Sequence, residues 1–382
     1  MPEATRVVLL SLDGFNHQAM TPELTPRLWA LGEAGGRAPD GGRCDLPSVT
    51  YPSHATLLTG CAAGTHLVRS NLAAAPRAGT VPGWAGERRV AVPTLFDACR
   101  AAGLRSSAIL GDHKLSSILG VETADDRWPR NGTPDADTAL DAFRYATNAA
   151  VRPYLLAAAA NAGLPFLFGH LNETDTWGHR LGPDHPETLA CYAATDAIVG
   201  EVRDALAADW SRTVLIVLSD HGMEPMVDAP TVDLVAAAAG GTFIAEVVDE
   251  GGAALVRLLP GVDAARAGAA VATVPGVAGW RQIEANVLLV EAEAGRLFSR
   301  RGTKSLRGVH GGPGTQRTTA VVAGGHAAVP AIAAAMNGRP PHGADWAPTI
   351  AGLLGLEMPG TEGRNLLIPE TNGAALERAD AR

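Results

Sequence analysis

The sequence predicts a doubly wound α/β fold, in which helices cover both faces of a mainly parallel sheet. Short runs of consecutive apolar residues alternate along the chain with alanine-rich stretches of helical spacing. Continuous apolar strands are typical of a sheet that is buried on both faces, and strand–helix alternation is typical of parallel pairing. At 382 residues the chain is long enough for one large domain or two closely packed ones.

The elements of the first half of the chain follow from apolar runs and their boundary residues. Strands are predicted at residues 7–13, 104–110 and 165–172, and helices at residues 24–35 and 93–103. Gly35 and Gly103 end the two helices, and Pro93 begins the second one, which are the usual positions of these residues. The stretch from Thr50 to Gly60 also reads as a helix start.

The second half contains a segment of different character. The longest predicted helix lies at residues 186–209, and strand 213–220 follows it. Two strand-like runs and a helical stretch then predict a small α+β insertion, at residues 241–248, 285–292 and 263–274. The core resumes with strand 318–325 and helix 345–355. We therefore expect a catalytic core of residues 1–227 and 301–370, an insertion or cap at 228–300, and a loose tail at 371–382.

Composition excludes several classes of protein. A formal net charge of −9, with 46% hydrophobic and 19% charged residues, indicates an ordinary globular protein and disfavours a general nucleic-acid-binding surface. The four cysteines are scattered without a CxxC pair, which argues against a cysteine zinc site and a dense disulfide framework. The N-terminal residues contain no basic segment and no membrane-length apolar run, so we expect a cytoplasmic protein that does not enter a membrane.

Polar residues gather where the predicted strands end. Asp13 follows the first strand, Asp175 and His179 follow strand 165–172, and Asp220-His221 closes strand 213–220. His310 lies between glycines late in the chain. Each of these alone has an ordinary alternative, such as a turn, a solvated helix face or a core histidine. Open α/β sheets place their ligands at the carboxyl edge of the strands, so we expect these side chains to converge there.

Three aspartates and three histidines are typical ligands of zinc, or alternatively of manganese or iron. Six ligands are too many for one tetrahedral ion and suit two ions, which at about 4 Å apart clamp the attacking and leaving oxygens of a displacement at phosphorus. Thr50 then has two interpretations. It caps the helix that begins there, and it is a nucleophile that a metal and the helix dipole activate; we expect it to do both.

Five motifs in this order resemble the alkaline phosphatase superfamily, and more narrowly its nucleotide pyrophosphatase/phosphodiesterase branch, which includes phosphonoacetate hydrolase. The motifs are Asp13, SVTYPSHATLLTG at 48–60, Asp175-x-x-x-His179, Asp220-His221-Gly222 and Gly308-Val309-His310-Gly311. The resemblance covers roughly residues 6–225 and 305–365 and implies an alkaline-phosphatase-like core. It is strong for the superfamily and weak for any particular substrate.

The resemblance also implies a role for each residue. One zinc ion would be held by Asp13, Thr50, Asp220 and His221, and a second by Asp175, His179 and His310. Thr50 would attack phosphorus and form a covalent phospho-threonine, which water releases. Asn71, 21 residues further on, would donate to a phosphoryl oxygen. His17, His54, His66, His170 and His326 are candidate supports for the ligands.

Two departures from the family pattern concern the substrate. Phosphonoacetate hydrolases carry a lysine pair that binds the substrate carboxylate, but here Asp112 replaces the first lysine and only Lys114 remains. His66-Leu67 replaces a common His-Gly, which predicts an altered pocket wall. Trp177, between two ligands, is a candidate stacking residue for the substrate.

These observations predict a dinuclear zinc hydrolase that cleaves a phosphodiester or pyrophosphate bond. We expect its substrate to be a small phosphorylated or phosphonate molecule, such as a nucleotide, and not a nucleic-acid polymer. Alternatives within the class are a phosphonate hydrolase that uses Lys114, a phosphomonoesterase and a phosphotransferase. The alternative outside it is a metal-stabilised binding protein. The sequence does not define the oligomeric state.

Overall fold

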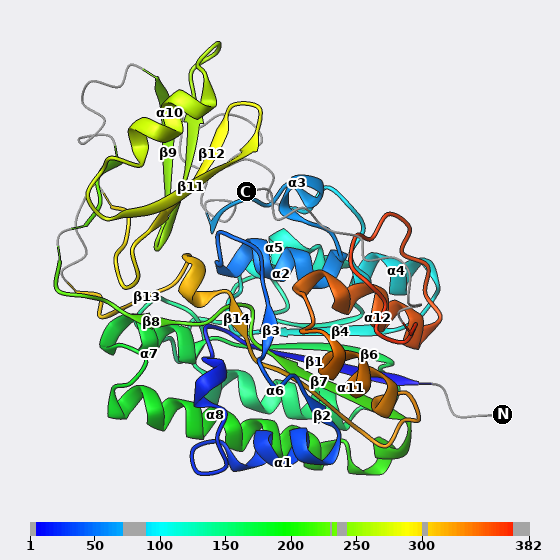
Figure 1. The fold of residues 1–382 in the computed structure, drawn as a ribbon. Coiled ribbons are helices and arrows are strands. Elements are labelled where there is room, and N and C mark those ends of the chain that lie inside the picture. Colours follow the sequence, from blue (N-terminus) through cyan, green and yellow to red (C-terminus); the bar gives the residue numbers. More distant parts are fainter. Residues whose placement is uncertain (1–4, 72–88, 230, 235–242, 300–304, 370–382) are drawn as a thin grey trace.

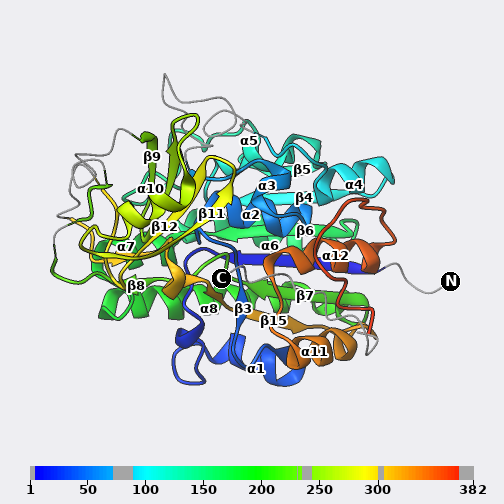
Figure 2. The ribbon, with the colours of Figure 1, turned by 45° about the horizontal axis from the view of Figure 1, so that its top comes forward.

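The fold is built on one seven-stranded sheet (Figure 1). The structure is a computed structural model that describes residues 5–71, 89–229, 231–234, 243–299 and 305–369, so the predicted tail at 371–382 lies outside the described residues. In spatial order the strands are β2 (Gly36–Arg37), β15 (Ala320–Ala323), β7 (Thr213–Leu218), β1 (Arg6–Leu12), β6 (Phe166–Leu171), β4 (Ser106–Leu110) and β5 (Asp126–Trp128). Figure 2 shows most of these strands side by side.

Five of these strands, from β7 to β5, pair in parallel, and only β15 and β2 run antiparallel to their neighbours. The mainly parallel sheet is therefore confirmed. In the register of the central strands, Leu12 of β1 lies opposite Leu171 of β6, and Ser11 lies opposite Leu218 of β7. The carboxyl ends of these three strands thus meet at one edge of the sheet, and the residues that follow each strand are brought together.

Helices cover both faces of the sheet, as expected for a doubly wound fold. One face is covered by α2 (Thr50–Thr59), α4 (Leu95–Ala101), α5 (Leu115–Leu119), α11 (Val329–Gly338) and α12 (Trp346–Leu354). The other is covered by α1 (Pro26–Ala34), α6 (Asn148–Ala160) and α8 (Pro186–Ala205). Neighbouring strand residues belong to opposite cores, with Val7 and Leu9 in the first and Val8 and Leu10 in the second.

Shorter elements complete this part of the described fold. They are α3 (Ala63–His66), α7 (Glu173–Leu181), β3 (Gly42–Arg43), β8 (Glu224–Pro225), β13 (Gly308–Val309) and β14 (Arg317–Thr318). β13 pairs with β8, and β14 with β3, as two small antiparallel ribbons. Within the residues that the structure describes, no helix is long and apolar enough to cross a membrane.

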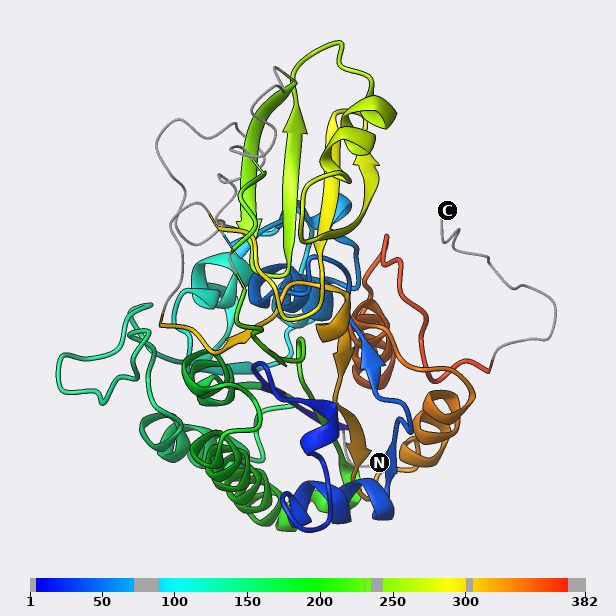
Figure 3. The ribbon, with the colours of Figure 1, turned by 60° about the vertical axis from the view of Figure 1, so that its left-hand side comes forward.

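A second, four-stranded antiparallel sheet lies near the carboxyl edge of the main sheet (Figure 3). Its strands, in spatial order, are β11 (Val277–Glu284), β12 (Val287–Ala292), β10 (Ala253–Leu258) and β9 (Ile244–Glu250). Helix α10 (Ala264–Val271) packs on one of its faces. All five elements fall within the segment that the sequence marks as an insertion, but only β9, β12 and α10 were predicted. Strands β10 and β11 were not.

Candidate metal and active site

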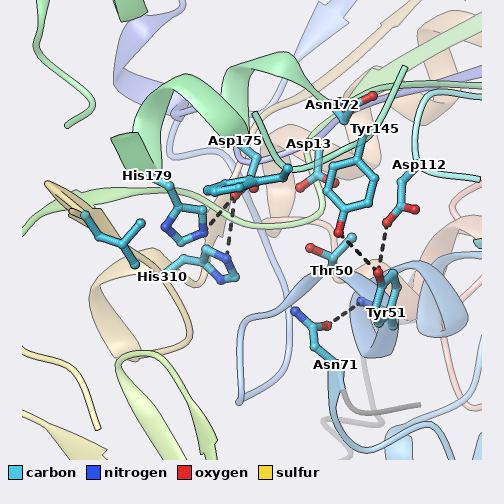
Figure 4. Close-up of a pocket in the computed structure, with 12 residues that line it drawn as sticks. Asp13, Thr50, Tyr51, Asn71, Asp112, Tyr145, Asn172, Asp175, His179 and His310 are labelled. Carbon is cyan, nitrogen blue, oxygen red and sulfur yellow. Dashed lines mark hydrogen bonds and ion pairs between the residues drawn. The ribbon is translucent and has the colours of Figure 1, made fainter. Parts of the chain in front are cut away.

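The six predicted ligands lie together at the carboxyl edge of the main sheet. Figure 4 shows four of them, Asp13, Asp175, His179 and His310. Asp13 comes directly after β1, and Asp220 and His221 come after β7. Helix α7 begins after β6 and carries Asp175 and His179 one turn apart, so both side chains lie on the same face of the helix. His310 follows β13, which the pairing with β8 places beside α7.

The ligand atoms form two adjoining groups. In one group, Oδ1 of Asp175 lies 3.5 Å from Nε2 of His179 and 3.6 Å from Nε2 of His310. In the other, Nε2 of His221 lies 3.4 Å from Oδ1 of Asp13 and 3.3 Å from Oδ2 of Asp220. The ligand atom of His221 is also within 4.8 Å of those of Asp175 and His310, so the two groups share an imidazole.

The three imidazoles are oriented by backbone carbonyls. Nδ1 of His179, His221 and His310 lies 2.9–3.0 Å from the carbonyl oxygens of Gly308, Gly222 and Ser48, respectively. A carbonyl oxygen only accepts, so Nδ1 is the protonated nitrogen of each ring. The lone pair on Nε2 therefore faces the carboxylates, which is the arrangement of a metal-binding histidine.

Unsatisfied carboxylate oxygens indicate that this site fits metal cations. Among the described residues, Oδ1 of Asp13, Oδ1 of Asp175 and Oδ2 of Asp220 are buried and have no hydrogen-bond partner. Ligands around a tetrahedral ion with bonds of about 2.0–2.2 Å stand about 3.3–3.6 Å apart. The four carboxylate–imidazole distances of 3.3–3.6 Å match this spacing.

Burial makes charged side chains unfavourable here in the absence of a cation. Burial raises the pKa of Asp13, Asp175 and Asp220, and the neighbouring carboxylates raise that of Asp13 further. Burial also lowers the pKa of His221 to about 4 and that of His310 well below its usual value. The imidazoles of His221 and His310 are thus neutral, as metal ligands must be, while the clustered acids favour a nearby positive charge.

Two of the five candidate supporting histidines contact the ligands. Nε2 of His170 lies 3.1 Å from Oδ2 of Asp13, and its Nδ1 accepts a hydrogen bond from the backbone of Asp112. Nδ1 of His54 lies 2.8 Å from the carbonyl oxygen of Thr50 and 3.5 Å from Oδ2 of Asp220. Both rings are completely buried, so they fix the positions of two carboxylates and of the first turn of α2.

Thr50 is the first residue of α2, and its hydroxyl faces the ligands. Its Oγ1 lies 3.3 Å from Nε2 of His221. The residue that caps the helix is Val49, and within the described part of the chain the Thr50 side chain makes no capping hydrogen bond. The expectation that Thr50 caps α2 is therefore wrong, because the backbone enters the helix one residue earlier and turns the hydroxyl into the site.

Thr50 and Asn71 line a cavity of about 230 Å³. Its lining residues are Asp13, Thr50, Tyr51, Asn71, Asp112, Phe143, Tyr145, Asn172, Asp175, His179, Leu306 and His310. Oδ1 of Asn71 accepts a hydrogen bond of 3.0 Å from the backbone N–H of Tyr51. This contact turns the amide nitrogen of Asn71 away from α2 and toward the cavity (Figure 4).

Residues 7–300 match the family of type I phosphodiesterases and nucleotide pyrophosphatases. The chain belongs to this family. It is 26% identical over 236 residues to an uncharacterized pyrophosphatase/phosphodiesterase of Schizosaccharomyces pombe, a match that covers 58% of this chain and 45% of the relative. It is 28% identical over 245 residues to human ectonucleotide pyrophosphatase/phosphodiesterase family member 7, covering 60% and 50% of the two chains. The chain thus spans about half the length of these relatives.

Solved structures of the same family share the fold. Murine ectonucleotide pyrophosphatase/phosphodiesterase 5 has a TM-score of 0.70 at 16% identity, over 94% of this chain and 97% of that one. An inactive variant of the murine protein in complex with AMP gives a TM-score of 0.70 at 17% identity over the same shares. The sheet and its helices are therefore those of the nucleotide pyrophosphatase/phosphodiesterase branch of the alkaline phosphatase superfamily.

Neither Lys114 nor Trp177 is brought to the cavity described above. Nζ of Lys114 lies 3.5 Å from the hydroxyl of Tyr145, which lines the cavity, and 4.9 Å from the centre of its ring, but Lys114 is not a lining residue. Trp177 lies two residues from each of the ligands Asp175 and His179 on α7, which places it about 200° around the helix. It packs with Arg180 instead.

The structure places further residues at this site that were not identified from the sequence as part of it. Asp112 accepts a hydrogen bond of 2.9 Å from the hydroxyl of Tyr51, and the hydroxyl of Tyr145 lies 3.5 Å from that of Tyr51. Asp112 follows β4 just as the metal ligands follow their strands, so this position was available as a signal. Tyr145 lies in a loop between β5 and α6, and nothing in the sequence pattern marks it. In the part of the chain that the structure describes, His66 and Leu67 do not line the cavity.

Proposed function

We propose that this protein is a dinuclear metal hydrolase that cleaves a phosphodiester or pyrophosphate bond through a covalent phospho-threonine at Thr50. The observation that carries the proposal is the hydroxyl of Thr50 beside His221, at one end of a cavity lined with carboxylate and imidazole ligands. Membership of the phosphodiesterase family supports phosphoester hydrolysis as the reaction class. The mixed oxygen and nitrogen donors suit zinc best, with manganese or iron as alternatives.

Each residue has a role in this proposal. Asp13, Thr50, Asp220 and His221 would hold one ion, and Asp175, His179 and His310 the other. Bound cations would lower the pKa of the Thr50 hydroxyl and offset the charge on the phosphoryl oxygens. Oγ1 of Thr50 would form a bond to phosphorus as the bond to the leaving oxygen breaks, and its proton would pass to water. A water molecule would then hydrolyse the phospho-threonine and restore the hydroxyl.

Two features of the chain would stabilise the charged phosphoryl group. The amide nitrogen of Asn71, turned to the cavity by the contact with Tyr51, would donate to a non-bridging oxygen. Thr50 stands at the N-terminus of α2, where the helix dipole favours negative charge. These groups are already oriented before a substrate binds, which is what such stabilisation requires.

A small nucleotide-like molecule is the substrate class that we favour. The family is named for phosphodiesterases and nucleotide pyrophosphatases, and the murine relative was solved in complex with AMP. Tyr51 and Tyr145 give this cavity aromatic side chains on the side away from His179 and His310 (Figure 4). A location in the cytoplasm stays a prediction from the sequence.

A substrate comparison tests this proposal. The zinc-loaded protein is assayed with bis(4-nitrophenyl) phosphate, 4-nitrophenyl phosphate and phosphonoacetate, with and without an added alcohol acceptor. We expect kcat/KM for the diester to exceed the other two by at least about tenfold. Preference for the monoester or the phosphonate would overturn the substrate class, and phosphorylated alcohol as the main product would indicate a transferase. No turnover of any substrate by fully metallated protein would support a binding protein instead.

A further inference from the structure

The small antiparallel sheet reaches the active site through one buried carboxylate. Glu250 is the last residue of β9 and is only 5% exposed. Its Oε2 accepts a hydrogen bond of 3.2 Å from the backbone N–H of Asn71. The two residues are 179 positions apart in the chain, so the contact ties the small sheet to the loop that follows α3.

Asn71 is thereby held from two sides. Glu250 holds its backbone, while the backbone N–H of Tyr51 on α2 holds its side-chain oxygen. With both anchors in place, the remaining amide nitrogen points into the cavity that Thr50 lines (Figure 4). Among the described residues, the contact with Tyr51 is the other hydrogen bond that positions this donor relative to Thr50.

The turn after Glu250 contacts a metal-ligand loop as well. The backbone N–H of Gly252 donates a hydrogen bond of 2.7 Å to the carbonyl oxygen of His310. A Cβ at Gly251 would lie 2.2 Å from that same oxygen, and Gly251 has a φ of +69° that favours glycine. The β9–β10 turn therefore approaches the His310 loop more closely than side chains allow, while Glu250 holds Asn71.

From these contacts we infer that Glu250 is a positioning residue for the phosphoryl-binding amide of Asn71, and that the β9–β10 turn is a structural part of the active site. The inference rests on the proposed function, since it assigns Glu250 to the same reaction. It gives the four-stranded sheet a role in the active site, because the sheet sets where the donor of Asn71 stands relative to Thr50 and His310.

Three variants of the full-length, zinc-loaded protein test this inference by kinetics. Glu250→Ala removes the acceptor, Glu250→Gln keeps a carbonyl oxygen of the same reach, and Glu246→Ala removes a carboxylate from the same strand as a control. We expect Glu250→Ala to lower kcat for the diester by about 10–100-fold with KM changed less than about threefold. Glu250→Gln and Glu246→Ala should stay within about threefold of the wild type.

A double variant separates positioning from general damage to the fold. If Glu250 acts through Asn71, adding Glu250→Ala to Asn71→Ala should lower kcat by less than about threefold more. If the fold-losses in kcat of the two single variants multiply in the double variant, the inference is overturned. Equal losses of kcat in Glu250→Ala and Glu250→Gln would overturn it as well.

Hydrogen exchange gives a readout that does not depend on catalysis. The amide of Asn71 should exchange at least about tenfold faster in Glu250→Ala than in the wild type or Glu250→Gln. Faster exchange in a protein that turns over no phosphoester would uphold the contact and reject the proposed function. Unchanged exchange at Asn71 would overturn the inference even in an active hydrolase.

Discussion

Oγ1 of Thr50 lies 3.3 Å from Nε2 of His221, at the point where helix α2 begins and beside the carboxyl end of β7. The hydroxyl thus stands within the ligand group instead of on the helix end. In the proposed mechanism Thr50 would attack phosphorus, and Asp13, Asp220 and His221 would hold a cation without it.

Thr50→Ala should therefore separate catalysis from metal binding. We expect turnover of a diester to fall by at least about 10³-fold, because the nucleophile is lost. Zinc content should stay near the wild-type value, because the other ligands remain. Thr50→Ser keeps a hydroxyl and should retain measurable turnover. Wild-type activity in Thr50→Ala would reject the covalent mechanism.

Metal stoichiometry tests the two ligand groups. His179→Ala should lower bound zinc from two ions per chain toward one, since it removes a ligand beside Asp175 and His310. His185→Asn is the matched control, because His185 caps helix α8 and is not one of the predicted metal ligands. Both are measured by elemental analysis after dialysis. An unchanged zinc content in His179→Ala, or an equal loss in His185→Asn, would contradict the assignment.

The convergence of the candidate ligands could be predicted from sequence, because the carboxyl ends of parallel strands lie at one edge of the sheet. Asp13, Asp175 and Asp220 each follow a continuous apolar strand, and parallel strands in register bring their ends to the same edge. His310 has no long strand before it, so the pattern of apolar strands alone does not place it at this edge. The structure shows that the two-residue ribbon of β13 and β8 carries it to that edge.

The remainder of the site depends on contacts that sequence patterns do not encode. Glu250 reaches Asn71 across 179 residues and from a separate sheet. Strand β11 was missed because its residues are mostly half-buried or exposed and lack a continuous apolar run. The antiparallel direction of β15 could not be read either, since a buried strand looks the same in both directions.

Asp112 should select against substrates that carry a carboxylate. Burial raises its pKa to about 6, so at pH 8 it is ionised in the cavity wall and repels a second carboxylate. Asp112→Asn removes the charge but keeps an oxygen that can accept a hydrogen bond from the hydroxyl of Tyr51. We expect this variant to lower KM for phosphonoacetate by about tenfold at pH 8. KM for a diester whose leaving group is uncharged should change little. Equal changes for both ligands would argue against electrostatic selection.

His66 should make the protein sensitive to acid. It is buried, bonded to Thr56 and to the backbone of Val68, and burial lowers its pKa to about 4. The unfolded state therefore binds a proton below about pH 6.5 that the folded state does not take up until about pH 4. The contribution of His66 to the free energy of unfolding is therefore fully present above about pH 6.5. It falls by up to about 3 kcal/mol as the pH drops to about 4.

Urea unfolding of wild type and His66→Asn from pH 7 to pH 4 measures this effect. The variant keeps an acceptor for Val68 and loses the titratable ring. It should be less stable at pH 7, and the difference from the wild type should shrink on acidification. Parallel pH profiles would show that His66 keeps its ordinary pKa in the folded protein.

Leu67 occupies a backbone conformation that suits glycine. It ends helix α3 with φ 64° and ψ 7°, the left-handed region, where a residue with a Cβ costs about 1–2 kcal/mol. Leu67→Gly should be more stable than Leu67→Ala by about 1 kcal/mol, because both lose the leucine side chain and only alanine keeps the strain.

Gly64, inside the same short helix, provides the opposite control. A Cβ there meets nothing within 4 Å among the described residues, so alanine should be more stable than glycine by about 0.5–1 kcal/mol. The two pairs are compared by urea unfolding at pH 7. If the difference in free energy of unfolding between glycine and alanine had the same sign at both positions, residue type would determine it, and not the left-handed backbone at Leu67.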